Sequence, residues 1–219
     1  MRSVVSATPT PSETLLRIEK ATQGDSEALG LLLGQYRDQL RRMVVLRLDP
    51  RVKGRVDASD VIQEGCLDAM RRIGEYAKEP STPFYIWLRF LVGQRIVDLH
   101  RAHLGALARE VGREVSLHGN PMPEASTYTF ATHLLGKLTS PSQAAIRAER
   151  RSRLQNALNA MDPIDREILV LRHYEQLTNG ESAMVLGLDK SAASKRYTRA
   201  LERLKEILST LNGGHSEEE

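Results

Sequence analysis

Cysteine is almost absent from this chain of 219 residues, in which Cys66 is the only thiol. A single cysteine excludes disulfide bonds and thiolate metal clusters within one chain. No apolar run approaches the roughly 20 residues that a membrane span requires. The N-terminus also lacks the charged and apolar regions of a signal peptide. These absences together predict a protein of the reducing cytoplasm.

Groups that carry chemistry are equally scarce. The six histidines are scattered, and although His100 and His103 could share a helix face, no third ligand lies near them in the sequence. We therefore expect no metal site. The sequence has no phosphate-binding glycine loop, no paired carboxylates in a definable cleft and no nucleophile elbow. We expect no catalytic residues, no cofactor and no enzymatic activity.

Aromatic residues make up only 5% of the chain, so its cores must be aliphatic. The abundant residues are Leu, Ala, Arg and Glu, which lose little side-chain freedom in a helix. The predicted fold class is all-α, with two helical domains joined by a long linker rich in Gly, Pro, Ser and Thr. A short helix is possible within that linker, near 130–138. The predicted organisation is a disordered arm at 1–11, a first domain at 12–110, a linker at 111–143, a second domain at 144–212 and a disordered tail at 213–219.

The first domain shows clear helix signals. Apolar residues three and four positions apart predict one helix over 28–48. Asp57 is a suitable N-cap for the next helix, with Asp60 three residues later in a near capping box. The apolar stripe of that helix includes Cys66 and predicts a buried, unreactive thiol. A further helix is predicted over 83–108, with a proline in its first turn.

The C-terminal half has the spacing of a helix-turn-helix. Asp162 and Pro163 provide an N-cap and a first-turn proline. The segment 178–181 reads T-x-x-E, a capping box that opens a short helix. Within that helix Ala183 is small enough for a close helix crossing. Gly187 can take the positive φ that a tight turn needs.

A third helix is predicted from Ser191 to about Leu208. Between positions 190 and 205 there are six basic residues and one acid. A helix that presents hydroxyls and Arg or Lys in its N-terminal half can enter a DNA major groove. The alternative is a solvated amphipathic helix, which the charge run alone would also fit. The outward face is predicted to hold Ser191, Ser194, Lys195, Arg196 and Arg199.

Two stretches of the sequence resemble a known family. DPIDREILVLRHYEQLTN and the basic helix after it resemble domain 4 of the sigma-70 superfamily. DASDVIQEGCLDAMRRIGEYA, followed by PFYIWLRFLVGQRIVDLHRAH, resembles domain 2. The domain order, with no domain between the two, is similar to that of extracytoplasmic-function (ECF) sigma factors, and the C-terminal phrase is most similar to their planctomycete-type branch. The resemblance covers about residues 15–108 and 154–208.

The resemblance implies that domain 2 has two roles. Its first role is to dock on the clamp coiled coil of the largest RNA polymerase subunit, through Asp60, Gln63 and Glu64. From the residues alone, Asp60 and Glu64 share one helix face with Asp68, opposite the apolar stripe. The second role is to hold the minus-ten promoter element as a single strand with a flipped base. The candidates on the polar side of that helix are Arg89, Gln94, Arg95, Asp98, His100 and Arg101. Trp87 could stack on a base, but its spacing from its apolar neighbours favours a core position.

In domain 4 the resemblance assigns Ser191, Ser194, Lys195, Arg196 and Arg199 to the minus-35 element. Gly180 lies inside a short helix, where glycine costs about 1 kcal/mol relative to Ala. The partners implied are RNA polymerase core and promoter DNA, with an anti-sigma factor as a further possibility and no membrane. The free protein is expected to be a monomer.

A second function fits the C-terminal half equally well. A helix-turn-helix transcription regulator would bind duplex DNA unaided and would be expected to dimerise. That hypothesis leaves the face formed by Asp60, Gln63 and Glu64 without a purpose. The leading prediction is therefore a sigma factor that binds core polymerase and directs it to promoters.

Overall fold

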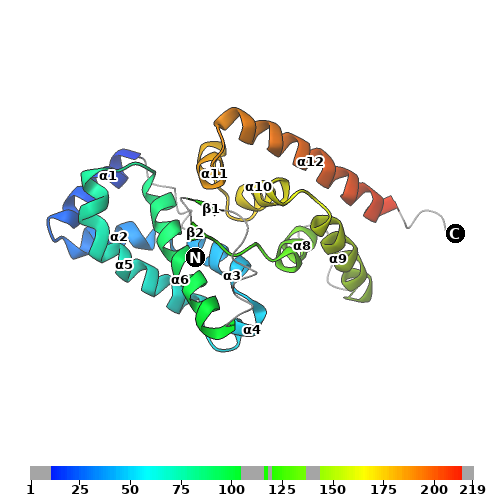
Figure 1. The fold of residues 1–219 in the computed structure, drawn as a ribbon, viewed down its shortest axis with the longest axis horizontal. Helices are drawn as coiled ribbons and strands as arrows, with labels where there is room; N and C mark the ends of the chain where they lie inside the picture. The colour runs from blue at the N-terminus through cyan, green and yellow to red at the C-terminus, as the bar shows by residue number, and fades with distance from the viewer. Residues whose placement is uncertain (1–10, 105–115, 118–119, 137–143, 214–219) are drawn as a thin grey trace, which may run out of the picture. The chain divides into compact units, whose positions relative to one another are not determined.

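The computed structural model describes residues 11–104, 116–117, 120–136 and 144–213. The chain divides into two compact units, Met1–Gly112 and Arg113–Glu219. In the described residues the only strands are two of two residues each, so the predicted all-α class is confirmed (Figure 1). The predicted arm and tail, except for their innermost residues, lie outside the described residues, as do positions 105–108 of the helix predicted over 83–108.

The first unit is a helical bundle with an aliphatic core. Leu32, Leu40, Met43 and Leu88 have no exposed surface, which agrees with the shortage of aromatic residues. The side chain of Asp57 accepts a hydrogen bond from the Ser59 N–H at 2.6 Å, so the predicted N-cap is confirmed. The helices of this unit are α1 (Pro11–Thr22), α2 (Ser26–Gly34), α3 (Arg37–Arg47), α4 (Pro50–Lys53), α5 (Ala58–Lys78) and α6 (Phe84–Leu104).

The prediction of one helix over 28–48 is wrong, because the chain turns at Gln35 and Tyr36 between α2 and α3. Gly34 ends α2, and glycine is about 1 kcal/mol less favourable than Ala in a helix. The Tyr36 ring then packs against Phe84 and Tyr85, with ring centroids 5.9 and 5.4 Å apart. This packing between elements outweighs the local periodicity that favoured a continuous helix.

Helices α5 and α6 form an antiparallel hairpin in which the two helices are closely packed at Gly65. A Cβ atom at this position would lie 2.5 Å from Cγ2 and 3.0 Å from Cα of Val92. Such distances are shorter than carbon–carbon contact allows, so glycine is what lets the two helices come this close.

Aromatic rings fill the end of the hairpin where residues 79–83 connect α5 to α6. Trp87 is half-buried and stacks on Tyr76, with ring centroids 4.6 Å apart and an interplanar angle of 28°. It also lies 5.5 Å from the Phe84 ring, so the predicted packing role of Trp87 is confirmed. Cys66 is half-buried rather than buried, and desolvation raises the pKa of its thiol, in agreement with low reactivity.

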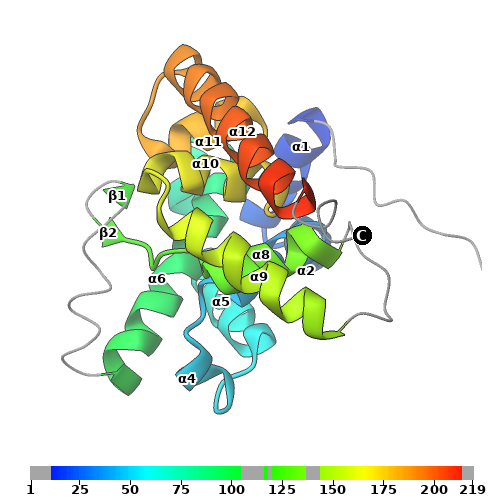
Figure 2. The same cartoon turned by 90° about the vertical axis from the view of Figure 1, so that its right-hand side faces the viewer.

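The second unit is also helical. The strands β1 (Ser116–Leu117) and β2 (Asn120–Pro121) pair antiparallel and precede the helices. Figure 2 shows α8 and α9 side by side, and α10 also packs against α12. The helices of this unit are α8 (Thr127–Gly136), α9 (Ala144–Asn159), α10 (Pro163–His173), α11 (Asn179–Leu186) and α12 (Lys190–Gly213).

Part of the predicted linker belongs to this second unit. The short helix expected there exists as α8, but it is packed rather than free. Phe130 and Ala131 have no exposed surface, and the His133 ring meets Tyr174 edge-on at 4.7 Å. Glu124 pairs with Arg166 at 3.3 Å. The boundary predicted at Ala144 is therefore too late, because buried apolar side chains of α8 complete the core.

Within the described residues, no helix combines the length and the apolar character needed to cross a lipid bilayer. They also contain no group of three or more His, Cys, Asp or Glu side chains placed to hold a metal ion.

Candidate functional sites

The outward face of α5 carries the three residues predicted to bind polymerase. Asp60, Gln63 and Glu64 are all exposed. The opposite face is buried through Val61 and Ile62, which are 1% and 4% exposed, and holds the helix on the bundle. The structure therefore brings the three predicted residues together on one accessible surface.

Asp68 differs from the other two acids predicted on that face. Its Oδ2 lies 3.0 Å from Nε of Arg95 on α6, and its Oδ1 lies 3.5 Å from Nη1 of Arg71. Arg95 in turn reaches Asp98 at 3.5 Å. Asp68 thus joins α5 to α6, and the acidic surface available to a partner is formed by Asp60 and Glu64.

The structure separates the six minus-ten candidates on α6 into two groups. Asp98 and Arg101 are exposed, and Gln94 and Arg95 are half-buried. Arg89 and His100, in contrast, are only 1% and 4% exposed. The prediction that these two lie on an accessible polar side is wrong. Helix α6 is packed on more than one side, because Ile86 and Val97 are buried in addition to the stripe formed by Leu88, Leu91, Val92 and Ile96, so it has no single buried stripe.

His100 has a structural role instead. Its Nε2 accepts a hydrogen bond from the Asp49 N–H at 3.1 Å, which ties α6 to the start of α4. Asp49 caps α4 and binds Arg51 through two hydrogen bonds of 3.0 and 2.8 Å. The hydrogen bonds from Arg51 lower the pKa of Asp49 to about 2, and burial lowers the pKa of His100.

We expect the first unit to lose stability in mild acid through His100. A protonated imidazole cannot accept the Asp49 N–H, and burial disfavours its charge. The folded pKa lies below the ordinary value of 6.5, so the stabilisation is complete above about pH 6.5 and is lost as the pH falls through the folded pKa. The stabilisation contributed by Asp49 is lost only at lower pH, as the pH falls from its ordinary pKa of 3.8 to its folded pKa of about 2.

Trp87, the only tryptophan, reports on this unit alone. Urea unfolding followed by its fluorescence should give a lower midpoint at pH 5.5 than at pH 7.5 for the wild type. The His100→Gln variant, which keeps an acceptor but cannot titrate, should show a much smaller difference. An equal difference in both proteins would contradict the assignment.

The helix-turn-helix has the predicted local geometry. The Glu181 N–H donates to Oγ1 of Thr178 at 3.2 Å, and the Thr178 N–H donates to the Glu181 carboxylate at 2.8 Å, so the capping box is confirmed. Gly187 has φ 64°, and Ala183 is 2% exposed. A Cβ at Gly180 would lie 3.3 Å from Cε of Lys190. This contact is with the flexible end of an exposed side chain, so the packing of α11 on α12 does not require glycine at this position.

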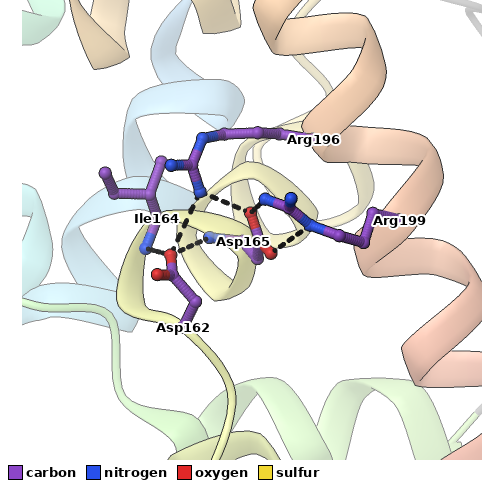
Figure 3. A network of polar contacts seen from close by, with 5 residues as sticks. All are labelled: Asp162, Ile164, Asp165, Arg196 and Arg199. Atoms are coloured by element: carbon purple, nitrogen blue, oxygen red, sulfur yellow. Dashed lines mark hydrogen bonds and ion pairs between the residues drawn. The ribbon is translucent and has the colours of Figure 1, made fainter.

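The outward face of α12 presents the predicted minus-35 residues unequally. Ser191, Ser194 and Lys195 are exposed. The arginines are held at the start of α10 by Asp165 (Figure 3). Nη1 of Arg196 donates to Oδ1 of Asp165 at 2.7 Å, and Arg199 donates from Nε and Nη2 to the two oxygens of the same carboxylate at 3.0 and 3.1 Å.

Asp162 completes this cluster. Its Oδ1 accepts from the N–H groups of Ile164 and Asp165, as an N-cap does, and from Arg196 at 3.2 Å. The Asp165 side chain is 11% exposed. Burial opposes its ionisation, but hydrogen bonds from Arg199 and Arg196 outweigh burial and hold its pKa below the usual range.

From the sequence alone, Asp165 is recognisable only as an acid in the first turn of α10. The arginines that it binds lie 31 and 34 positions further along the chain. Their spacing of three residues places them on one helix face, but nothing in the sequence indicates which carboxylate faces them. The close packing at Gly65 was missed for the same reason.

Comparison with known families gives the class of this protein. The family described as Sigma-70 region 2 matches residues 32–104, and the family described as Sigma-70, region 4 matches residues 151–204. Together they cover more than half of the chain. The chain therefore belongs to the sigma-70 family of RNA polymerase sigma factors, which bind core polymerase and direct promoter recognition and transcription initiation.

Its relatives place it among the ECF members of that family. The chain is 28% identical over 189 residues to the ECF RNA polymerase sigma factor SigD of Mycobacterium tuberculosis, covering 86% of this chain and 81% of SigD. It is 26% identical over 191 residues to the ECF RNA polymerase sigma factor BldN of Streptomyces coelicolor, covering 87% of this chain and 64% of BldN. The solved structure of CnrH in complex with the cytosolic domain of CnrY shares the fold, with a TM-score of 0.53 and 20% identity over 90% of this chain and 98% of CnrH. The stand-alone regulator is not supported.

Proposed function

We propose that the outward face of α5 is the docking surface for RNA polymerase core, on the clamp coiled coil of the largest subunit. Asp60, Gln63 and Glu64 make this surface acidic and polar. The observation that carries the proposal is that all three are exposed on one face of a helix whose other side is fixed in the core. Like charges four residues apart weaken an isolated helix slightly, and a basic partner would offset that cost.

We further propose that α6 binds the minus-ten element. The candidates that remain are Gln94, Arg95, Asp98 and Arg101. Arg89 and His100 are not part of this surface, because a buried side chain cannot contact a DNA strand unless the bundle opens. Arg101 is the accessible cation of this group, and its contact with Asp98 is long, at 3.9 Å.

For the second unit we propose that α12 enters the major groove at the minus-35 element. Ser191, Ser194 and Lys195 lie in its exposed N-terminal half, the part of a recognition helix that contacts base edges. Arg196 and Arg199 are close enough to join them, but both are bound to Asp165.

We infer a monomer when free, action in the cytoplasm by binding alone, and membership of the planctomycete-type branch. We also propose control by an anti-sigma factor. A protein partner of that kind is compatible with the fold, since CnrH is seen in complex with the cytosolic domain of CnrY.

The test is to mix the purified chain with bacterial core polymerase and measure complex formation by size exclusion with light scattering. We expect a monomer in isolation, a one-to-one complex with core, and promoter-dependent transcription only from the mixture. A dimer that binds duplex DNA tightly by itself and ignores competent core would refute the proposal.

A further inference from the structure

The cations of the recognition helix are not equivalent. Lys195 is exposed, and no carboxylate among the described residues pairs with it. Arg196 and Arg199 instead share Asp165, which accepts three hydrogen bonds from them within 3.1 Å (Figure 3). Arg196 also reaches Asp162. The two arginines therefore meet two carboxylates before any DNA arrives.

This pairing removes charge from a surface that otherwise attracts DNA. Sequence-independent binding is driven mainly by cations that neutralise phosphates and release counterions. The positive charge of a guanidinium that is bound to a nearly buried carboxylate is largely neutralised, so it attracts a phosphate only weakly. The carboxylate itself repels phosphate. Lys195 keeps its full charge at the surface.

We propose that Asp165 is a specificity-determining residue: it binds Arg196 and Arg199 and withholds their charge from sequence-independent contact with the DNA backbone. Affinity for duplex DNA then depends more on the exposed groups that can reach base edges, Ser191, Ser194 and Lys195. The inference rests on the proposed role of α12 as the minus-35 reader, and it deepens that role by naming a residue that disfavours the wrong DNA.

A purely structural crosslink would not require this arrangement. The inner face of α12 already docks on the unit through Ala193, Ala200 and Leu204, which are at most 5% exposed. The Arg199 side chain is 62% exposed despite its bonds to Asp165. An apolar residue in place of Asp165 would hold the helix equally well. Only an acid, however, can neutralise arginines that remain at the surface.

The first test compares two cations on the same helix. The full-length chain is titrated with a labelled 20-base-pair duplex of mixed sequence, and affinity is measured by fluorescence anisotropy between 50 and 200 mM NaCl. Each phosphate contact contributes about 0.9 to the slope of log affinity against log salt. We expect Lys195→Gln to reduce the slope by about that amount and Arg199→Gln by less than half of it.

The second test removes the acid. Asp165→Asn should raise affinity for the same duplex by about tenfold at 100 mM salt and steepen the slope by about 1, because Arg199 becomes available while Arg196 keeps its contact with Asp162. In the Asp165→Asn background, adding Arg199→Gln should then reduce the slope by about 0.9, the value of one phosphate contact. Glu202→Gln is the matched control: it makes the same charge change on α12 at an exposed position, and it should produce a clearly smaller gain.

The outcomes separate the two proposals. Equal losses for Lys195→Gln and Arg199→Gln, or weaker duplex binding by a folded Asp165→Asn variant, would overturn the role of Asp165 and leave α12 as the DNA-binding helix. No change of slope for either cation would refute the DNA-binding face itself. The comparison of Lys195→Gln with Arg199→Gln uses exposed side chains only, so it stands even where Asp165→Asn fails to fold.

Discussion

Replacing Asp60, Gln63 and Glu64 together by alanine is expected to abolish binding to core polymerase at concentrations that saturate the wild type. Side chains at the centre of an interface commonly contribute 1 kcal/mol or more each, so the loss should be about 100-fold or greater. The wild-type fold should persist, because all three side chains are exposed and α5 is held from its other side. Competition against a labelled wild-type chain for a limiting amount of core would measure the loss.

A matched variant distinguishes a specific surface from a general charge effect. Gln23, Glu27 and Asp38 are exposed in the same unit, and their replacement by alanine removes the same two charges and one amide. This control should bind core almost as the wild type does. Core binding that survives in both variants would keep the family function but place the docking surface elsewhere.

The second large effect is expected for Gly65→Ala, which should lower the free energy of unfolding of the first unit. In an exposed helix Gly→Ala stabilises by up to about 1 kcal/mol, yet here the added Cβ would meet Val92 at 2.5 Å. The contact includes the Val92 Cα at 3.0 Å, so the backbones of α5 and α6 must separate. Overpacking of this kind costs typically 1–3 kcal/mol, and we expect a net loss of about 2 kcal/mol. Urea unfolding monitored by the fluorescence of Trp87 would measure it.

Gly74 provides the internal comparison. It lies on the same helix, and a Cβ there would meet nothing within 4 Å. Gly74→Ala should therefore stabilise the unit by up to about 1 kcal/mol. Combining Gly65→Ala with Val92→Ala should recover part of the loss, because Cγ2 is removed while the contact with Cα remains. Equal effects of alanine at positions 65 and 74 would show that the helices are not in close contact.

Local signals in the sequence were reliable where a side chain bonds to its own helix. Asp57, Asp162 and the Thr178–Glu181 box cap the helices as predicted, because each interaction spans only two or three residues. The left-handed turn at Gly187 follows the same logic. These features are determined by neighbours in the chain and require no knowledge of the fold.

The errors arise where distant elements meet. The turn at Gln35 and Tyr36 depends on rings of α6, and the burial of His100 depends on a backbone N–H that lies 51 positions earlier. Periodicity can identify a polar position on α6 but not the neighbours that surround it. A carboxylate that binds two arginines across a gap of about 30 residues is likewise invisible until the helices are packed.

The packing of α8 determines how the second unit can be divided from the rest. The family match begins at residue 151, yet Phe130, Ala131 and Glu124 lie before it. Phe130 and Ala131 are buried in the core of the unit, and Glu124 pairs with Arg166 inside the match. A fragment cut at the family boundary would lose these groups and expose the apolar surface that they cover, and the loss of one buried side chain the size of Phe alone costs about 3–5 kcal/mol. Chimaeras that exchange promoter specificity between sigma factors should therefore transfer residues 122–136 of this chain together with its recognition helix.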